Sequence, residues 1–525
     1  MCAFRNCTAC IRAMAWQAAV HETQADNVMT SAILDDLVET GGYEPCETET
    51  FETHLSHVLL AGDRAIKLKK PVKLAFVDFS TLEKRHSACL AELEANRKMG
   101  SSLYLDVLPV TQAAGGKHVL DGGGETVDWV VVMKRFDSAK RFDSLVEAGA
   151  LDPALAWRTA DRIVDMHAGL EPVTTAGHAA DYRKVIRDLR QTEADGAARD
   201  GLSIGEPSPF DLLDTELAHV DPLIEQRRRA GKVRRTHGDL HLRNLCLYEG
   251  EVTPFDCLEF DERLATTDVL YDLAFLLMDL LQAGLPEAAN RVMNRYWDGA
   301  QEDEAALALL PFFMALRASV RMAVAVEGGA LAEADRYRRL ALTLLKRRKP
   351  VFVAIGGLSG TGKSTVAAAL APDLPGAAGA RLLRSDVLRK RGQGTPEAGR
   401  ADREAYAPEQ RAKVYRQLAG HAEEALTAGC SVLADATFQE AAAREALASV
   451  SVAPLQAFWL ETSLATRLER VSNRRGDASD ADEAVARQQE EPGQLEPEWR
   501  RIDAGRTVDK IAADIARRLG GTADT

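Results

Sequence analysis

Residues 357–364 read Gly-Leu-Ser-Gly-Thr-Gly-Lys-Ser and decide the fold of the second half of the chain. They match G-x-x-x-x-G-K-[ST], in which a glycine-rich backbone surrounds the phosphates of a nucleotide at the start of a helix. A strand-like, apolar stretch at 351–355 leads directly into the motif. Further strand-like stretches at 381–384, 431–434 and 455–460 alternate with helical stretches. This alternation predicts an α/β P-loop NTPase domain with a parallel sheet.

The P-loop motif assigns roles to its own residues. Lys363 would neutralise oxygens of the β- and γ-phosphates, and the hydroxyl of Ser364 would bind Mg²⁺. The backbone N–H groups would surround the phosphates at the positive end of the following helix. The predicted ATP-binding residues of this loop are Gly357, Gly360, Thr361, Gly362, Lys363, Ser364 and Thr365.

Two acidic residues follow predicted strands of the same domain. Asp435 follows the strand at 431–434 and is the Walker-B-like candidate for holding the metal. Asp386 follows the strand at 381–384, in a setting that resembles small P-loop kinases of the gluconate kinase and zeta-toxin type. That resemblance implies that Asp386 is the catalytic base for an acceptor hydroxyl, with Arg389 as a substrate or phosphate contact. A helix N-cap is the structural alternative for Asp386.

An arginine-rich segment follows the strand at 455–460, and Arg467 and Arg470 in it share one helix face. Similar kinases carry a lid at this place, and the arginines of that lid close over the phosphates. We therefore expect Arg467, Arg470 and Arg474 to contact ATP. A merely solvated, charged helix is the alternative.

A second stretch, residues 237–244, reads His-Gly-Asp-Leu-His-Leu-Arg-Asn. It resembles the H-G-D-x-x-x-x-N loop of the aminoglycoside phosphotransferases, which share the protein-kinase fold. Asp256, twelve residues after Asn244, and the sequence Tyr-Asp-Leu-Ala at 271–274 extend the resemblance. The expected fold of this part is therefore an α+β protein-kinase-like, aminoglycoside phosphotransferase-like domain.

The resemblance implies a set of roles around this loop. Asp239 would accept the proton of the attacking hydroxyl and act as the catalytic residue. Asn244 and Asp256 would bind Mg²⁺, and Glu259 is a second, less suitable metal ligand. His237 would brace the loop by hydrogen bonds.

The region before the loop has the order of a kinase N-lobe: strand, strand, helix, strand, strand. The predicted elements cover residues 53–61, 64–72, 82–99, 103–110 and 127–133. This order agrees with the resemblance of the 237–244 loop.

An N-lobe of this kind supplies a lysine for the phosphates and a glutamate that holds the lysine. Lys67 is the preferred lysine, and Lys69 competes because side chains two apart share one face of a strand. Glu92 is the preferred partner, since an unpaired buried lysine would be costly, and Glu94 is the second choice. Met133 lies where the hinge should meet the adenine of ATP.

Three segments follow from these patterns. The prediction is a disordered N-terminal extension at 1–32, a kinase-like domain at 33–346 with an N-lobe at 33–135 and a C-lobe at 136–346, and a P-loop kinase domain at 347–525. From about residue 35 to 520 the chain resembles bacterial fusions of an aminoglycoside phosphotransferase-like domain with a P-loop kinase domain.

Composition narrows the expected partners and location. The formal net charge of −14 argues against nucleic acid as a partner. The absence of a long uninterrupted apolar run argues against a membrane segment. Eight scattered cysteines without a metal or disulfide pattern suit a reducing cytoplasm.

The predicted function is a bifunctional phosphotransferase that uses ATP and Mg²⁺ to phosphorylate hydroxyl groups of small-molecule acceptors. In the first alternative, one half is the kinase and the other half an ATP-sensing regulatory module. In a further alternative, the P-loop half acts on a macromolecule or a nucleotide sugar. The sequence predicts neither the acceptor nor the oligomeric state.

Overall fold

The computed structural model describes residues 24–40, 47–53, 55–73, 77–200, 205–259, 261–392, 407–473 and 482–520. The chain divides into two compact units. The first unit contains the described residues up to Ala283 together with Phe312–Leu345, and the second contains Gly284–Pro311 together with the described residues from Lys346 onward.

The first unit begins with an antiparallel, six-stranded sheet. Its strands are β1 (Thr48–Glu52), β2 (Ser56–Ala61), β3 (Arg64–Lys69), β4 (Tyr104–Gln112), β5 (His118–Leu120) and β6 (Glu125–Lys134), in the spatial order β1-β2-β3-β6-β4-β5. All neighbouring strands run antiparallel. This is the sheet of the N-lobe that the sequence predicts, with β1 and β5 added.

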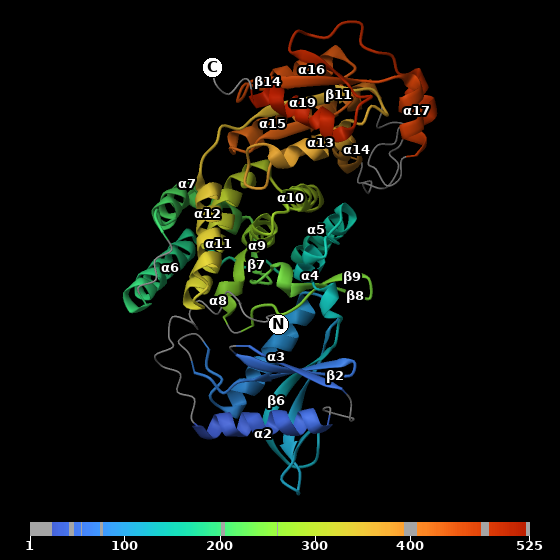
Figure 1. Cartoon of the computed structure of the whole chain (residues 1–525). Coiled ribbons are helices and arrows are strands. Elements are labelled where there is room, and N and C mark those ends of the chain that lie inside the picture. The colour runs from blue at the N-terminus through green and yellow to red at the C-terminus, as the bar shows by residue number, and fades with distance from the viewer. Residues whose placement is uncertain are drawn as a thin grey trace. The chain divides into compact units, whose positions relative to one another are not determined.

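A helix packs on each face of this sheet: α2 (Gln24–Thr40) on one and α3 (Leu82–Lys98) on the other (Figure 1). Side chains alternate along β6, so Val130 and Val132 join the buried cluster of α2, whereas Val131 joins that of α3. The central strand β6 is therefore apolar on both faces, and it pairs directly with β3, the strand that carries Lys67.

The N-terminal helix α2 differs from the prediction. The sequence predicts a disordered extension at 1–32, but α2 begins at Gln24, and residues 1–23 lie outside the described ranges. Ile33 and Leu37 are buried against the sheet. A short helix needs such packing to be stable, and this packing supports the turns that precede Ile33.

The second lobe of the first unit is mainly helical. Its longer helices are α4 (Phe142–Glu147), α5 (Pro153–Ala168), α6 (Ala179–Asp200), α7 (Phe210–Arg229), α9 (Val269–Gln282), α11 (Leu310–Glu327) and α12 (Leu331–Leu345). Its short elements are η2 (Ser138–Lys140), η3 (Leu242–Asn244), α8 (Glu262–Ala265), the pair β7 (Val233–Arg235) and β10 (Thr266–Asp268), and the hairpin β8 (Leu245–Tyr248) and β9 (Glu251–Pro254). The hairpin β8–β9 directly follows the 237–244 loop.

One stretch, Glu304–Glu327, is long and apolar enough to cross a membrane, but 94% of its most apolar window is buried inside the structure. A core helix passes the same test of length and composition. The stretch Glu304–Glu327 is therefore weak evidence for a membrane segment.

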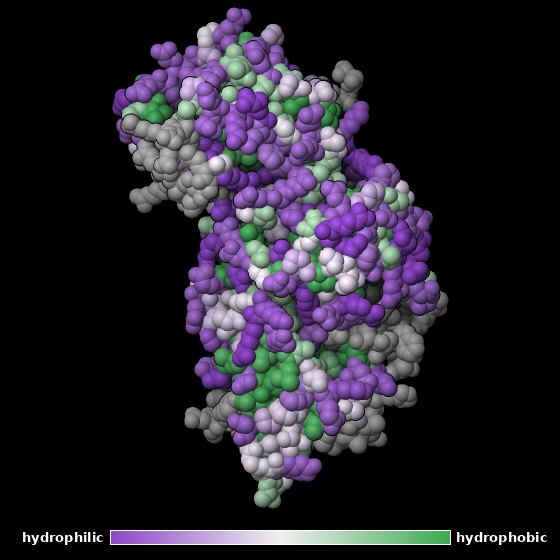
Figure 2. Space-filling model, turned by 180° about the vertical axis from the view of Figure 1, so that it is seen from behind, coloured by the Kyte–Doolittle hydropathy of each residue, from purple (hydrophilic) through white to green (hydrophobic). Residues whose placement is uncertain are grey.

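Figure 2 shows a largely hydrophilic face with a hydrophobic patch on the first unit. Large exposed apolar side chains of that unit include Leu90 and Trp157.

The second unit contains a parallel, five-stranded sheet. Its strands are β11 (Phe352–Gly357), β12 (Arg381–Arg384), β13 (Val432–Asp435), β14 (Leu455–Glu461) and β15 (Trp499–Asp503), in the order β12-β13-β11-β14-β15. Its helical elements after the sheet begins are α13 (Lys363–Leu370), η5 (Ala371–Asp373), α14 (Ser385–Gly392), α15 (Pro408–Thr427), α16 (Ala441–Ala448), α17 (Leu464–Ser472), α18 (Glu483–Gln488) and α19 (Val508–Gly520). The predicted α/β P-loop fold is confirmed.

The second unit also contains α10 (Pro286–Ala300) and η4 (Glu304–Leu309), which come before its first strand, β11, in sequence. The predicted boundary at 346/347 assigns residues 284–311 to the C-lobe, but their contacts group them with the P-loop unit. Buried polar side chains of α10 and η4, such as Asn294 and Glu304, bind β12 and account for this difference.

Candidate functional sites

Two lysines of β3 share one buried carboxylate in the first unit. Lys67 Nζ lies 2.8 Å from Glu92 Oε1, and Lys69 Nζ lies 2.7 Å from Glu92 Oε2. Lys67 and Lys69 point to the same side because they are two apart on a strand. Glu92, on α3, is fully buried. Glu94 pairs with Lys98 at the surface instead.

Two carboxylates after β9 complete this network. Lys67 Nζ lies 2.8 Å from Asp256 Oδ1, and Lys69 Nζ lies 2.8 Å from Glu259 Oε1. The backbone of Asp256 is left-handed, with φ +57°, a conformation that costs energy for a non-glycine residue. Its N–H donates a 3.1 Å hydrogen bond to the Tyr104 hydroxyl, which helps to hold this conformation. The structure thus brings together three residues that the sequence predicts for the first site: Lys67, Glu92 and Asp256.

Charge compensation sets the protonation of this cluster. Burial would raise the pKa of Glu92, but the charges of Lys67 and Lys69 outweigh it and lower that pKa to about 2. Burial would lower the pKa of Lys67, but the carboxylates of Asp256 and Glu92 raise it well above the ordinary lysine value. The pKa of Lys69 is raised in the same way, against burial, by Glu259 and Glu92. Glu92, Lys67 and Lys69 are therefore charged at neutral pH.

The HGD loop places Asp239 at the centre of a buried hydrogen-bond network. Asn244 Nδ2 donates to the Asp239 backbone O at 3.0 Å and to Asp239 Oδ2 at 2.9 Å. His241 Nε2 lies 3.4 Å from Asp239 Oδ2. Asp239 is fully buried. Because Asn244 donates through its nitrogen, its Oδ1 is the atom that could bind a cation.

His237 braces the loop. Its Nε2 donates to the Phe255 backbone O at 3.0 Å, and its Nδ1 accepts from the Asp239 N–H at 3.3 Å. These two contacts require the neutral tautomer with the proton on Nε2. Burial outweighs the nearby Asp272 and Asp239 and lowers the pKa of His237 below its usual value. The neutral state agrees with a bracing role rather than proton transfer.

Asp272, on α9, holds the 237–244 loop through hydrogen bonds from two backbone N–H groups of that loop. It accepts hydrogen bonds from the Gly238 N–H at 2.8 Å and the His237 N–H at 3.3 Å, and its Oδ2 lies 3.1 Å from His167 Nε2. Asp268 is the N-cap of the same helix and binds Arg227. Neither side chain contacts Asp239 in the described hydrogen bonds, which agrees with structural roles for both.

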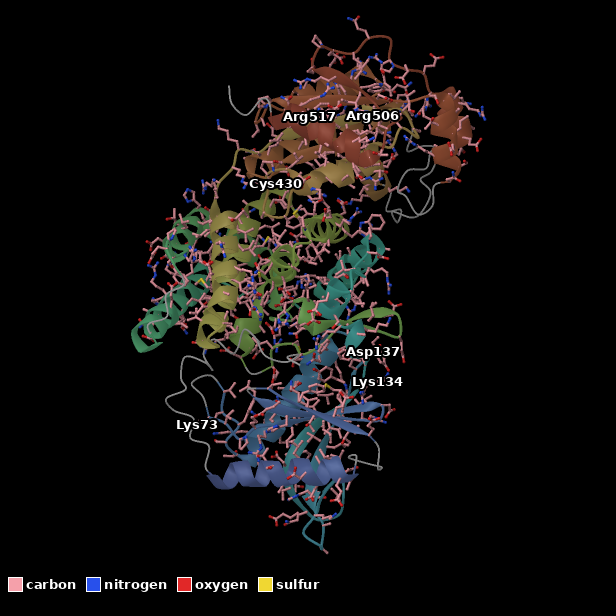
Figure 3. The ribbon with its side chains drawn as sticks, in the orientation of Figure 1. Lys73, Lys134, Asp137, Cys430, Arg506 and Arg517 are labelled. Atoms are coloured by element: carbon pink, nitrogen blue, oxygen red, sulfur yellow. The ribbon has the colours of Figure 1, made fainter. Side chains whose placement is uncertain are left out.

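The predicted hinge lies at the end of β6. Met133 packs in the cluster of α3 and Phe255, with only partial exposure. The next two backbone N–H groups are already engaged, because Lys134 donates to Leu103 O at 2.8 Å and Arg135 donates to Asp63 O at 2.7 Å. Figure 3 shows Lys134 and Asp137 on this connection. Adenine recognition there would need groups other than these two N–H donors.

The P-loop of the second unit connects β11 to α13. Gly360 has φ +85°, and Gly362, the N-cap of α13, has φ +90°. A Cβ on Gly360 would lie 2.4 Å from the backbone O of Arg467, so only glycine fits. Thr361 Oγ1 donates to Leu358 O at 2.8 Å, and Lys363 Nζ donates to the same oxygen at 3.1 Å. The lysine therefore lies over the loop.

A cavity of about 670 Å³ lies in front of this loop. Its lining includes the predicted Gly360, Thr361, Gly362, Lys363, Ser364, Thr365, Asp386, Asp435 and Arg470, but not Gly357. The charged lining residues absent from the prediction are Arg384, Glu469 and Arg506. Arg506, labelled in Figure 3, comes directly before α19 and binds Asp514 at 3.0 Å. Arg506 belongs to no recognisable sequence motif, so the sequence does not predict it as a site residue.

Arg384 lies between the two predicted metal ligands of this cavity. Its Nη2 donates to Ser364 Oγ at 3.3 Å, and its Nε lies 3.4 Å from Asp435 Oδ2. Asp386 lines the same cavity and forms an ion pair with Arg389 on α14. Ser364, Asp435 and Asp386 are therefore brought together around one space.

The arginines of the predicted lid have different positions. Arg467 is buried and donates hydrogen bonds to the Ser359 backbone O at 3.0 Å and to the Ala486 backbone O. It therefore binds the backbone of the P-loop and does not line the cavity. Burial lowers the pKa of Arg467 below the usual arginine value. Arg470 lines the cavity and donates to Thr361 O at 3.1 Å. Arg474 lies outside the described residues.

Both sites have oxygen donors of the kind that Mg²⁺ prefers. Asn244 with Asp256, and Ser364 with Asp435, offer an amide or hydroxyl oxygen and a carboxylate each. Mg²⁺ typically takes one or two protein carboxylates and completes its shell with phosphates and water. In the described ranges no group of three or more His, Cys, Asp or Glu side chains could hold a metal alone. The donor sets thus fit a metal that arrives with a nucleotide.

Comparison with known proteins gives the family. Residues 119–310 match the family described as "Phosphotransferase enzyme family", and residues 352–492 match the family described as "AAA domain". An uncharacterized protein of Mycobacterium tuberculosis is 30% identical over 455 residues, which cover 83% of this chain and 88% of the relative. The chain belongs to the family that this relative represents. An uncharacterized protein of Mycobacterium bovis matches to the same extent.

The chain thus combines a phosphotransferase domain with a P-loop domain. A gluconokinase from Sinorhizobium meliloti 1021 is 22% identical, covers 34% of this chain and 96% of its own, and has a TM-score of 0.25. A choline/ethanolamine kinase family protein from Mesorhizobium loti is 14% identical, covers 61% of this chain and 94% of its own, and has a TM-score of 0.40. At these TM-scores neither likeness assigns a substrate to this chain.

Proposed function

We propose that the chain is an ATP- and Mg²⁺-dependent bifunctional phosphotransferase that phosphorylates hydroxyl groups of small molecules at two separate sites. One observation carries the proposal: each unit contains its own lysine, its own pair of oxygen ligands and its own carboxylate base. These sets are Lys67, Asn244, Asp256 and Asp239 in the first unit, and Lys363, Ser364, Asp435 and Asp386 in the second.

In the first site, Lys67 would bind the phosphates of ATP and orient them. Asn244 and Asp256 would hold Mg²⁺, which supplies positive charge against the phosphate oxygens when bound. Asp239 would take the proton of the acceptor hydroxyl. Asn244 Nδ2, at 2.9 Å from Asp239 Oδ2, would keep that carboxylate oriented.

In the second site, the P-loop N–H groups and Lys363 would bind the β- and γ-phosphates, with Arg470 beside them. Ser364 and Asp435 would hold Mg²⁺. Asp386, which lines the same cavity and forms an ion pair with Arg389, would accept the proton of the acceptor hydroxyl. The cavity of about 670 Å³ supports an acceptor of small-molecule size.

Transfer of ³²P from ATP to a panel of small metabolites tests this function. We expect Asp239→Asn to abolish one group of products and Lys363→Ala to abolish a different group, while the double variant forms none. If neither single variant reduces any transfer, the proposed function is wrong.

If one variant abolishes all transfer and the other only changes its ATP dependence, the regulatory alternative holds instead. Mass-spectrometric metabolite profiling of a deletion strain would then identify the acceptor of the active half.

We also propose a cytoplasmic location. The cysteines in the described ranges, Cys89, Cys246, Cys257 and Cys430, are buried and unpaired. Burial raises the pKa of the Cys89 thiol to about 12, so it stays protonated and unreactive. Such thiols suit a reducing compartment. Cell fractionation with an antibody to the chain tests this, and recovery from an extracytoplasmic fraction would contradict it.

A further inference from the structure

Two asparagines of α10 cover the start of β12, the edge strand of the parallel sheet, and the residues just before it. Asn290 Nδ2 donates to Ala378 O at 2.8 Å and to Ala380 O at 2.9 Å. Asn294 Oδ1 accepts from the Leu382 N–H at 2.7 Å. Side-chain amides thus take the place of a neighbouring strand at an edge that would otherwise expose backbone donors and acceptors. All of these groups belong to the second unit.

An arginine of β12 fixes the same edge from the side chain. Arg381 is almost completely buried, and its Nε lies 2.9 Å from Glu304 Oε2 on η4. Its Nη2 lies 2.7 Å from Asp298 Oδ1 on α10, and its Nη1 donates to Asn294 Oδ1 at 3.1 Å. These charged partners fix the position of the buried Arg381 guanidinium, because the loss of one partner would leave an uncompensated charge.

Asp298 extends the network to α14. Its Oδ1 lies 2.6 Å from Arg391 Nη2, so one carboxylate holds both β12 and α14. β12 ends at Arg384, and α14 contains Asp386 and Arg389. Arg384 and Asp386 line the cavity in front of the P-loop, and Arg389 pairs with Asp386. The α10 network therefore reaches the second site through β12 and α14, the two elements that carry Arg384 and Asp386.

We propose that α10 and η4, residues 284–311, are a positioning element of the P-loop unit that sets the acceptor side of the second site through Asp298, Glu304 and the two asparagines. In sequence they lie inside the kinase-like domain, between α9 and α11. The P-loop unit is thus discontinuous, and its acceptor side is built by residues that precede its own first strand. The acceptor role of Asp386 rests on the proposed function, but the positioning of β12 and α14 does not.

Hydrogen–deuterium exchange of the full chain tests the positioning without any enzymatic assay. Asp298→Asn removes the charge that holds Arg381 and Arg391. We expect the amides over residues 381–392 to exchange about tenfold faster or more. Amides of α19 and of the P-loop should keep their rates. Glu287→Gln makes the same chemical change on an exposed residue of α10 and should alter nothing. Asp298→Glu, which keeps the charge, should recover part of the protection.

Two results would overturn the proposal: unchanged exchange over 381–392 in Asp298→Asn, or an equal rise across the whole second unit, which would mean a general structural role. If Asp298→Asn fails to fold, Arg391→Gln cuts the same bond at its more exposed end and should give the same local effect. Where a Lys363-dependent acceptor is found, its KM should rise in Asp298→Asn while the KM for ATP stays constant. No Lys363-dependent transfer at all would contradict the proposed function and leave the exchange result to decide the positioning.

Discussion

Glu92 is the residue on which the first site depends most. It is the one carboxylate in contact with both Lys67 and Lys69 among the described ion pairs. Glu92→Gln removes that charge and leaves two buried ammonium groups short of a partner. We expect the free energy of unfolding of the first unit to fall by about 3–5 kcal/mol at pH 7. Urea unfolding followed by hydrogen exchange of α3 peptides measures it for this unit alone.

The same residue predicts a pH dependence. The pKa of Glu92 is about 2 in the folded chain against 4.5 for an ordinary glutamate, so its charge stabilises the fold above pH 4.5. That contribution, about 3 kcal/mol, is lost as the pH falls from about 4.5 toward 2. The difference in stability between the native chain and Glu92→Gln should therefore shrink below pH 4.5. A constant difference from pH 7 to pH 3 would contradict this.

The two lysines should separate in function. Lys67 is partly exposed and reaches Asp256, whereas Lys69 is buried and reaches Glu259. With Lys363→Ala silencing the second site, Lys67→Met should weaken ATP binding to the first site about tenfold or more. Lys69→Met should chiefly lower the stability of the unit, by about 3 kcal/mol or more. Titration with a fluorescent ATP analogue, together with unfolding, measures both. Equal effects of the two variants would show that their roles are not distinct.

The lysine pair shows how far sequence can go at the residue scale. A period of two places Lys67 and Lys69 on one face, and the spacing of a kinase N-lobe points to Glu92. It does not reveal that one carboxylate serves both lysines, because that depends on how α3 crosses the sheet. Arg467 shows the reverse case: its helical spacing suggested a lid, whereas tertiary packing turned it toward the P-loop backbone.

At the element scale, the P-loop is defined by one close approach. Gly360→Ala would bring a Cβ within 2.4 Å of the Arg467 backbone at φ +85°. The resulting shift should cost about 1–3 kcal/mol and weaken ATP binding at the second site about tenfold or more. Calorimetric titration in a Lys67→Met background isolates this site.

Gly420→Ala is the matched control, because Gly420 lies within α15 and its Cβ would meet nothing within 4 Å. It should leave binding unchanged and stabilise the helix by about 0.5–1 kcal/mol. Equal losses of binding in both variants would mean that the close approach of Gly360 is not the cause.

Several elements could not be predicted because their sequences lack an apolar pattern. β15 reads Trp-Arg-Arg-Ile-Asp, and only Trp499 and Ile502 in it are buried. β1 is a polar edge strand. By contrast, β12 spans the predicted residues 381–384, since it lies between clear turn signals and a helix start. Periodicity therefore finds buried elements and misses polar edges.

On the scale of the whole molecule, sequence motifs locate the two units but not the division of the chain between them. The motifs mark each centre, at 237–244 and 357–364, and both folds follow from their surroundings. The assignment of α10 to the second unit rests on buried polar contacts such as those of Arg381 and Asn294. Polar residues in a helix ordinarily signal a solvated surface, so this assignment needs the structure.

The central claim is that one chain contains two independent ATP sites, and calorimetric titration with a non-hydrolysable ATP analogue and Mg²⁺ tests it most directly. We predict two tightly bound analogues per native chain, one in Lys363→Ala, one in Lys67→Met and none in the double variant, because each substitution weakens binding at its own site about tenfold or more. A native chain that binds a single analogue, or a single substitution that removes both, would contradict the claim.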